Sequence, residues 1–198
     1  ISLGENLDRK ENIGFQALID AVAAAPGAPV KQALLDAGIG TDISCFFEVD
    51  VRQPFFSIVA KNAEASQKDT FVAIIEETLR DLAEKGVDRK SLAAALNHDE
   101  FKYREADYGS YPKGLMYGLQ MCETWLYDDT KPFVYLELGD TYKALKKELD
   151  TSFYEDMIKR CLLDNTHKSV VVVKPVKGLT GQKEKALAAA LAEKKASM

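Results

Sequence analysis

Two histidines and three cysteines are the residues best suited to chemistry, and their spacing limits what they can do. A catalytic zinc ion needs three protein ligands around one point, and two histidines four residues apart on a helix supply two of them. His98 and His167 are far apart in the sequence, and neither has a second histidine at helical spacing. The run His98-Asp99-Glu100 has its carboxylates at the wrong positions for a zinc motif. We therefore interpret it as a polar helix surface and predict no metal ligand in this chain.

The cysteines Cys45, Cys122 and Cys161 are odd in number, widely spaced and without a C-x-x-C pair. This pattern argues against a disulfide framework and against a thiolate zinc site, and it fits a reducing compartment. Cys122 and Cys161 fall on predicted apolar helix faces, where a buried thiol is inert. A nucleophilic pair of either cysteine with His167 stays open as an alternative, although a turn residue bonded to backbone is the common role of such a histidine.

Other polar groups give weaker signals. We interpret the carboxylate pairs Glu76-Glu77 and Asp128-Asp129 as surface charge rather than as a general acid and base. The glycines of "KGLTGQK" at 177–183 lack the G-x-x-x-x-G-K-[ST] spacing of a phosphate loop. We predict no catalytic residue in the chain and name no substrate-binding residue.

Aromatic side chains gather in the stretch 100–129, which also holds the only tryptophan. They are Tyr103, Tyr108, Tyr111, Tyr117, Trp125 and Tyr127. Such a group offers large contact area with polar tips and could line a peptide groove; packing between helices is the interpretation we favour.

The composition is that of an ordinary globular protein. The 198 residues are 46% hydrophobic and 29% charged, and the net charge is -5 with both signs interspersed. Because no basic field is present, we predict no nucleic-acid partner. We see no apolar run approaching the roughly 20 residues of a membrane span and predict no membrane partner. The start, "ISLGENLDRKEN", lacks the features of a signal peptide and resembles the tail of a strand, as at a cut edge.

The elements that position these residues follow from periodicity and capping signals. Apolar spacing predicts a buried helix from 13 to about 25, a second helix between Pro29 and Gly38, a helix ending near Lys85-Gly86 and another starting around Asp88. Alternation predicts a strand pair over 43–51 and 55–60, with Pro54 at an edge or bulge.

The second half of the chain is predicted to be mostly helical. Ser110 is the expected cap of a helix over 111–127 whose apolar face holds Leu115, Leu119, Cys122 and Leu126, Asp140 is the expected cap of another, and Ser152 with Glu155 has capping-box spacing. "SVVVVKP" predicts one strand that returns to the sheet. From Gly178 the chain is a helix or linker whose partner lies elsewhere. The fold class is therefore α+β, with helices covering a largely antiparallel sheet.

The aromatic stretch also resembles a known family. Its matching positions are Phe101, Arg104, Glu105, Gly109, Ser110, Pro112, Lys113, Gly114, Leu115, Trp125, Leu126, Tyr127 and Asp128. In this order they resemble a segment of the presequence-protease branch of the insulinase/pitrilysin-like zinc metallopeptidases. "PVKQALLDAGIGTDI" and "LLDNTHKSVVVVKP" resemble further segments, so the likeness extends to Pro175.

The resemblance implies a place within a larger enzyme. These peptidases have four related α+β domains in two halves, joined by a helical linker, which close over short unstructured peptides. Their zinc site, an inverted His-x-x-Glu-His motif plus a distal Glu, lies in the first domain. Residues 1–176 resemble the non-catalytic second domain, truncated at its N-terminus, and 177–198 the start of the linker.

These expectations extend to cofactor, partners and location. The parent protein is expected to bind zinc and to cut peptides, whereas this chain alone is expected to be inactive. Expected partners are the remaining domains of the parent, peptide substrates and a second copy of the fragment. The expected location is the cytoplasm, with an organelle matrix as alternative. Two other functions stay open, a structural or partner subunit without activity in the parent and a self-contained cysteine hydrolase.

Overall fold

The structure is a computed structural model that describes residues 1–197. Its helices are α1 (Arg9–Ile19), α2 (Pro29–Asp36), α3 (Lys68–Lys85), α4 (Arg89–Glu105), α5 (Lys113–Trp125), α6 (Gly139–Lys147), α7 (Phe153–Met157) and α8 (Leu179–Ala196). Two π-helical stretches, η1 (Asp20–Ala24) and η4 (Ile158–Leu163), continue α1 and α7, and short 3-10 turns η2 (Ala65–Gln67) and η3 (Glu148–Asp150) precede α3 and follow α6. The strands are β1 (Asp42–Glu48) and β2 (Phe55–Lys61).

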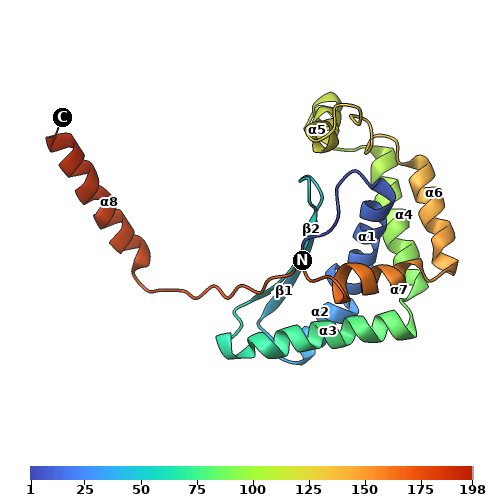
Figure 1. The fold of residues 1–198 in the computed structure, drawn as a ribbon, viewed down its shortest axis with the longest axis horizontal. Coiled ribbons are helices and arrows are strands. Elements are labelled where there is room, and N and C mark those ends of the chain that lie inside the picture. The colour runs from blue at the N-terminus through green and yellow to red at the C-terminus, as the bar shows by residue number, and fades with distance from the viewer. Residues whose placement is uncertain (198) are drawn as a thin grey trace.

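The sheet is an antiparallel pair, as alternation predicted. β1 and β2 align from Asp42 opposite Lys61 to Glu48 opposite Phe55. Residues 1–3 extend the sheet by one short segment, because Ser2 bridges to Phe55 and Leu3 N–H donates to Pro54 C=O at 2.7 Å. The strand-like start of the chain is thus confirmed. With helices packed on this sheet, the α+β class is confirmed as well (Figure 1).

The core forms around α1, which lies between the sheet and the other helices. The Phe15 ring packs edge-on against Phe47 at 4.9 Å and Phe56 at 5.9 Å, measured between ring centroids. On the other side, Gly14 lets neighbouring helices approach: a Cβ there would lie 2.9 Å from a methyl carbon of Leu145. The helix predicted from residue 13 is therefore the buried centre of the fold, although it begins earlier, at Arg9 after the capping Asp8.

One helical stretch, 9–36, is long and apolar enough to span a membrane, with a mean hydropathy of 1.3. This finding differs from our expectation that no apolar run approaches that length. Within the 18-residue window of this stretch that meets the criterion, 56% of the residues are buried inside the protein. Core helices have the same property, and side chains such as Leu18, Ile19 and Leu34 are fully enclosed by other elements.

Local signals in the first half of the chain predicted the element ends correctly. Pro29 stands at the first position of α2, and Gly38 follows its end at a φ of +67°, where glycine has no steric penalty. Asp88 caps α4 by accepting the backbone N–H of Ser91 at 2.9 Å. α3 ends at Lys85 before Gly86, as predicted.

Three capping predictions in the second half are wrong. α5 is preceded by Pro112 rather than capped by Ser110, because Asp107 and Gly109 form the turn before it. Asp140 lies within the first turn of α6, where it binds Lys143 at 3.0 Å.

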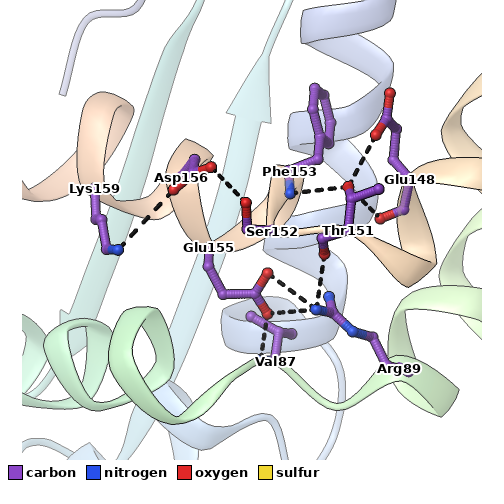
Figure 2. Close-up of polar contacts among 9 residues, drawn as sticks. All are labelled: Val87, Arg89, Glu148, Thr151, Ser152, Phe153, Glu155, Asp156 and Lys159. Carbon is purple, nitrogen blue, oxygen red and sulfur yellow. Dashed lines mark hydrogen bonds and ion pairs between the residues drawn. The ribbon is translucent and has the colours of Figure 1, made fainter.

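The third wrong prediction is the capping box of Ser152 and Glu155, as Figure 2 shows. Ser152 donates its hydroxyl to Asp156 at 2.8 Å, while Thr151 Oγ1 accepts the N–H of Phe153. The Glu155 carboxylate instead faces the α3–α4 turn, where it accepts the Val87 N–H at 2.8 Å and pairs with Arg89 at 3.1 Å. A buried carboxylate gains more from a backbone N–H and a guanidinium than from one cap bond.

The predicted strand at "SVVVVKP" is also wrong. Residues 165–176 form no ladder with the sheet, and the valine side chains are largely exposed. The chain leaves the body beside the N-terminus as an extended segment (Figure 1). A strand needs a neighbour for its backbone N–H and C=O groups, and none of the described residues fills that position.

The last helix, α8, lies apart from the body of the protein (Figure 1). Its residues are exposed throughout, including Leu187 and Leu191. The division into a domain over 1–176 and a linker start over 177–198 stays a prediction. An exposed apolar residue on a helix of this kind is consistent with a contact outside the chain.

Removing the Glu155 carboxylate should destabilise the fold. Glu155→Ala leaves the buried Val87 N–H without an acceptor, and we expect the free energy of unfolding to fall by about 2 kcal/mol. The measurement is urea unfolding followed by circular dichroism. Its matched control is the adjacent Asp156→Ala, whose exposed carboxylate should cost about 0.5 kcal/mol or less. Equal losses in the two variants would contradict the role assigned to Glu155.

Candidate functional site

The most conspicuous surface of the protein is an apolar one on and around α5. Its exposed members are Tyr111, Leu115, Tyr117, Leu119, Trp125, Leu126 and Phe133, which we call the α5 surface. Leu126 is 75% exposed and Tyr111 is 64% exposed. α5 and the loop after it lie at one end of the body, away from α2 and α3 (Figure 1). Exposed apolar groups in this number mark a contact surface for a ligand or another chain.

The helix over 111–127 was thus predicted correctly in type and wrongly in burial. Leu115, Leu119 and Leu126 do share a helix face, but this face meets solvent. Of the aromatic group, Tyr103 packs as predicted: its ring lies 5.9 Å from that of Tyr142, and its hydroxyl donates to Leu136 C=O at 2.9 Å. Three other members of the group are exposed: Tyr111, Trp125 and Tyr127. Periodicity reports that a helix is two-sided and does not report what covers its apolar side.

A buried polar network fastens the end of α5 to the start of α1. The Tyr135 hydroxyl donates to Asn6 C=O at 2.6 Å and accepts from Asn12 Nδ2 at 3.1 Å. Asn6 Nδ2 donates to Glu123 C=O, and Thr124 Oγ1 donates to Lys131 C=O at 2.5 Å. Asn6 and Thr124 are fully buried. Sequence reasoning missed this network, since single asparagines next to a helix start read as turn residues.

Carboxylates surround the same junction. Burial, together with the nearby charges of Asp50 and Glu48, raises the pKa of Glu123 to about 7. Burial also raises the pKa of Asp50. Acidic side chains alone do not make a metal site, and residues 1–197 contain no group of three or more His, Cys, Asp or Glu that could hold a metal ion.

The His98-Asp99-Glu100 run lies on α4 and does not converge on one point. Burial and the charge of Asp20 raise the pKa of Asp99 to about 6. Glu100 turns to the other side, where it pairs with Lys146 and with Arg104. His98 is exposed. Only His98 is thus the exposed helix surface that we predicted, whereas Asp99 is half-buried and Glu100 is a buried member of a structural ion pair.

Among residues 1–197, no hydrogen bond joins a cysteine thiol to a histidine. Cys161 is buried and donates its thiol to Glu11 at 3.3 Å, and burial raises its pKa to about 12. Burial likewise raises the pKa of the Cys45 thiol to about 11. Cys122 is half-buried on α5. Thiols held in the protonated form are poor nucleophiles, which argues against Cys45 and Cys161 as catalytic nucleophiles.

The remaining candidates have structural roles. His167 donates its N–H to Asn165 Oδ1 at 2.8 Å and accepts the Ser2 N–H at 2.9 Å through its carbonyl. Glu76 pairs with Lys168, and Asp128 accepts two bonds from Thr130.

Three more of the candidate positions lie at the surface. Glu77 and Asp129 are exposed, as predicted for surface charge. Gly178 precedes α8 at a φ of +78° and is exposed.

A second feature of the surface is concave and lies between β2, α3 and the segment after η4. It is a groove of about 930 Å³ lined on one side by 55–60 and on the other by 166–173. Its floor includes Phe71, Ile75 and Leu79 of α3. The α5 surface and this groove are two places where the structure offers contact to other molecules.

The half-buried Glu123 should make the attachment of α5 depend on pH. Because the folded state raises its pKa from an ordinary value near 4.5 to about 7, the fold favours the protonated form, and stability decreases as pH rises from 4.5 to 7. We expect the fluorescence of Trp125, the only tryptophan, to titrate with a midpoint near 7. Glu123→Gln should remove this transition. Asp99→Asn is the control, and loss of the transition in that variant instead would assign it elsewhere.

No protein-family model matches the chain. Among curated proteins, the chain is 38% identical over 195 residues to Protein HypA of Clostridium perfringens. This alignment covers 98% of the chain and 20% of that protein. It is 30% identical over 174 residues to Presequence protease 1, chloroplastic/mitochondrial, of Arabidopsis thaliana, with coverage of 85% and 16%.

Two more distant similarities were also found. The mitochondrial presequence protease of Xenopus laevis is 24% identical over 177 residues, or 87% of the chain and 17% of that protein. A solved structure of a peptidase from Alicyclobacillus acidocaldarius covers 80% of the chain and 34% of its own length, with 18% identity and a TM-score of 0.43. The chain spans about a fifth or less of the length of the curated relatives it matches. The chain is therefore homologous to one segment of the presequence proteases, which confirms the resemblance to an insulinase-like fragment noted from the sequence.

Proposed function

We propose that this chain is the non-catalytic second domain, with the start of the linker, of a zinc metalloendopeptidase that degrades short unstructured peptides. The observation that carries the proposal is the homology to presequence proteases over 85% of the chain. Residues 1–197 also hold no group of three or more His, Cys, Asp or Glu that could bind a metal ion. The name of the Arabidopsis relative gives presequences as what that enzyme cuts.

The α5 surface supplies the contact that such a domain needs. Tyr and Trp side chains offer large area with little loss of conformational freedom, and they suit contact with extended peptides of varied sequence. Leu119 and Trp125 are both about half exposed, at 53% and 49%. We propose that this surface faces the peptide chamber and contributes to its wall.

The zinc ion belongs to the remaining part of the parent protein in this proposal. The described residues of this chain do not fit a zinc site, since no three ligand side chains converge. A bound zinc ion would supply a polarised water for attack on a peptide carbonyl. This chain would contribute enclosure and orientation of the peptide, and would be inactive alone.

Partners and location follow from the same proposal. The partners are the other domains of the parent and its peptide substrates, with no role for nucleic acid or membrane. The plant and frog relatives are named as organellar proteins, whereas the Clostridium relative is bacterial. The cytoplasm remains our prediction, and an organelle matrix is the alternative that the organellar names favour.

The alternative within the family is a structural or partner subunit whose parent lacks activity. This alternative predicts the same features for this chain, because the zinc motif that distinguishes the two functions would lie elsewhere in the parent. The other alternative is a cysteine hydrolase using Cys122 or Cys161, and the raised pKa of Cys161 argues against that residue as its nucleophile.

Incubation with an unstructured peptide and zinc separates these functions. The chain alone should leave the peptide intact by mass spectrometry, and the full-length protein should cleave it in a chelator-sensitive way. An inactive full-length protein would support the structural subunit. Cleavage by the chain alone would overturn the proposal, and its sensitivity to a chelator or to thiol alkylation would identify the type of site.

The isolated chain is also expected to self-associate through the α5 surface. Leu119→Glu places a charge on that surface, and we expect the dimer dissociation constant to rise about tenfold or more in analytical ultracentrifugation. The matched control is Leu187→Glu on α8, where the leucine is 61% exposed. A clean monomer at high concentration would contradict the expectation, as would an equal effect of both substitutions.

A further inference from the structure

The groove between β2 and the segment 166–173 has the features of an empty strand position. At its closed end, residues 1–3 already occupy the space between the two sides. Leu3 N–H donates to Pro54 on the β2 side, while Ser2 N–H donates to His167 C=O at 2.9 Å on the other. Asn165 Nδ2 adds a bond to Ser2 C=O at 2.8 Å. The two sides are therefore held apart by the width of one strand.

The outer edge of β2 beyond this point has unpaired backbone groups. Ile1 exchanges two hydrogen bonds with Phe56, in which each residue donates its nitrogen to the other's carbonyl, at 2.9 and 2.8 Å. In an antiparallel ladder such pairs recur at every second residue. The N–H and C=O groups of Ile58 and Ala60 hence face the groove, whereas those of Ser57 and Val59 face β1. Among residues 1–197, no backbone group bonds to Ile58 or Ala60 from the groove side.

The opposite wall has the shape of a strand without its ladder. Val170 and Val172 are 47% and 43% exposed, and the alternate Val171 and Val173 are 78% and 88% exposed. This period of two is that of extended backbone with one side against the protein. Lys168 fixes the beginning of this wall to α3 through its 2.8 Å ion pair with Glu76.

The floor of the groove is apolar, as the inner face of a sheet requires. Phe71 and Ile75 of α3 are half-buried beneath it, and Phe56 and Ile58 lie beside them on β2. Side chains of a strand inserted here would alternate between this floor and solvent. The volume of about 930 Å³ is room for a peptide segment rather than for a small ion.

We propose that this groove receives a β-strand in line with residues 1–3 and continuous with Ile1, antiparallel to β2 and to residues 168–173. The inserted strand would pair with Ile58 and Ala60 on one side and with the valine segment on the other. The sheet would then hold four adjacent strands, and "SVVVVKP" would become the strand that its composition favours. Recognition would be through backbone hydrogen bonds, the chemistry of strand addition at a sheet edge.

The inference is independent of the peptidase proposal, because it concerns pairing and not catalysis. Its occupant is a segment of the longer protein that the chain's relatives, about five times its length or more, lead us to expect. A second copy of the chain or a free peptide at the same edge are the competing occupants.

Amide hydrogen exchange measured by NMR tests the proposal. The chain is compared with the same chain extended by about six residues, the mean length of a strand, taken from the coding sequence before Ile1. We expect the amide protection of Ile58, Ala60 and Val171 to rise about tenfold or more in the extended chain. Val59 is the internal control, because its amide faces β1 in both proteins. A Gly/Ser/Pro extension of equal length is the matched control and should change nothing.

The other outcomes contradict the proposal in different ways. Unchanged exchange at Ile58 and Ala60 in the extended chain would show that no strand enters. Protection that is already high in the original chain and increases with its concentration would assign the groove to a second copy. Protection that is high and independent of concentration would mean that the valine segment itself closes onto β2.

Discussion

The packing of α1 against both the sheet and the helices is the constraint on which the rest of the structure depends. Phe15 on one side of this helix contacts Phe47 and Phe56 of the two strands. On the other side, Gly14 has no side chain, so Leu145 of α6 and Met157 of α7 can approach its backbone. Interiors pack at the density of organic crystals, and a helix shared by two layers fixes the distance between them. The strands on one side of α1 and the helices on the other take their positions from this packing.

Long-range bonds decide the positions of the elements that α1 does not touch. Glu155 is 68 positions from Val87 in the sequence and accepts its N–H, which fixes the α3–α4 turn on α7. Tyr135 is 129 positions from Asn6 and donates to its carbonyl, which fixes the end of α5 on the start of α1. Buried polar groups of this kind are costly unless paired, so each pair restricts the fold to one arrangement. The sheet lacks such closure on its outer edge, where the groove stands open.

Predictions from sequence succeeded where the stabilising contacts are local. Pro29, Gly38 and Asp88 mark helix ends because each acts on backbone groups within a few residues. They failed where a distant group competes, as when Glu155 binds Arg89 instead of completing a capping box with Ser152. The valine strand failed for a related reason, since β propensity does not provide the partner that a ladder needs. The α5 surface shows the third kind of failure, in which the pattern was correct and the burial was not.

The groove and the α5 surface differ in which part of the chain makes the contact, the backbone in one case and the side chains in the other. The groove would bind a strand through backbone hydrogen bonds, so many side chains are tolerated in that strand. The requirement is that those facing Phe71 and Ile75 are apolar. The α5 surface acts through Trp125, Leu126 and their neighbours, whose identity sets shape and area. In the two proposals above, the groove would fix this chain within a larger protein, and the α5 surface would contact the peptide that this protein encloses. Neither requires a reactive side chain, which fits thiols held protonated by burial and carboxylates held in ion pairs. In the proposed function, a segment of this kind would contribute to a peptidase by its position, and the chemistry would come from residues elsewhere in the parent.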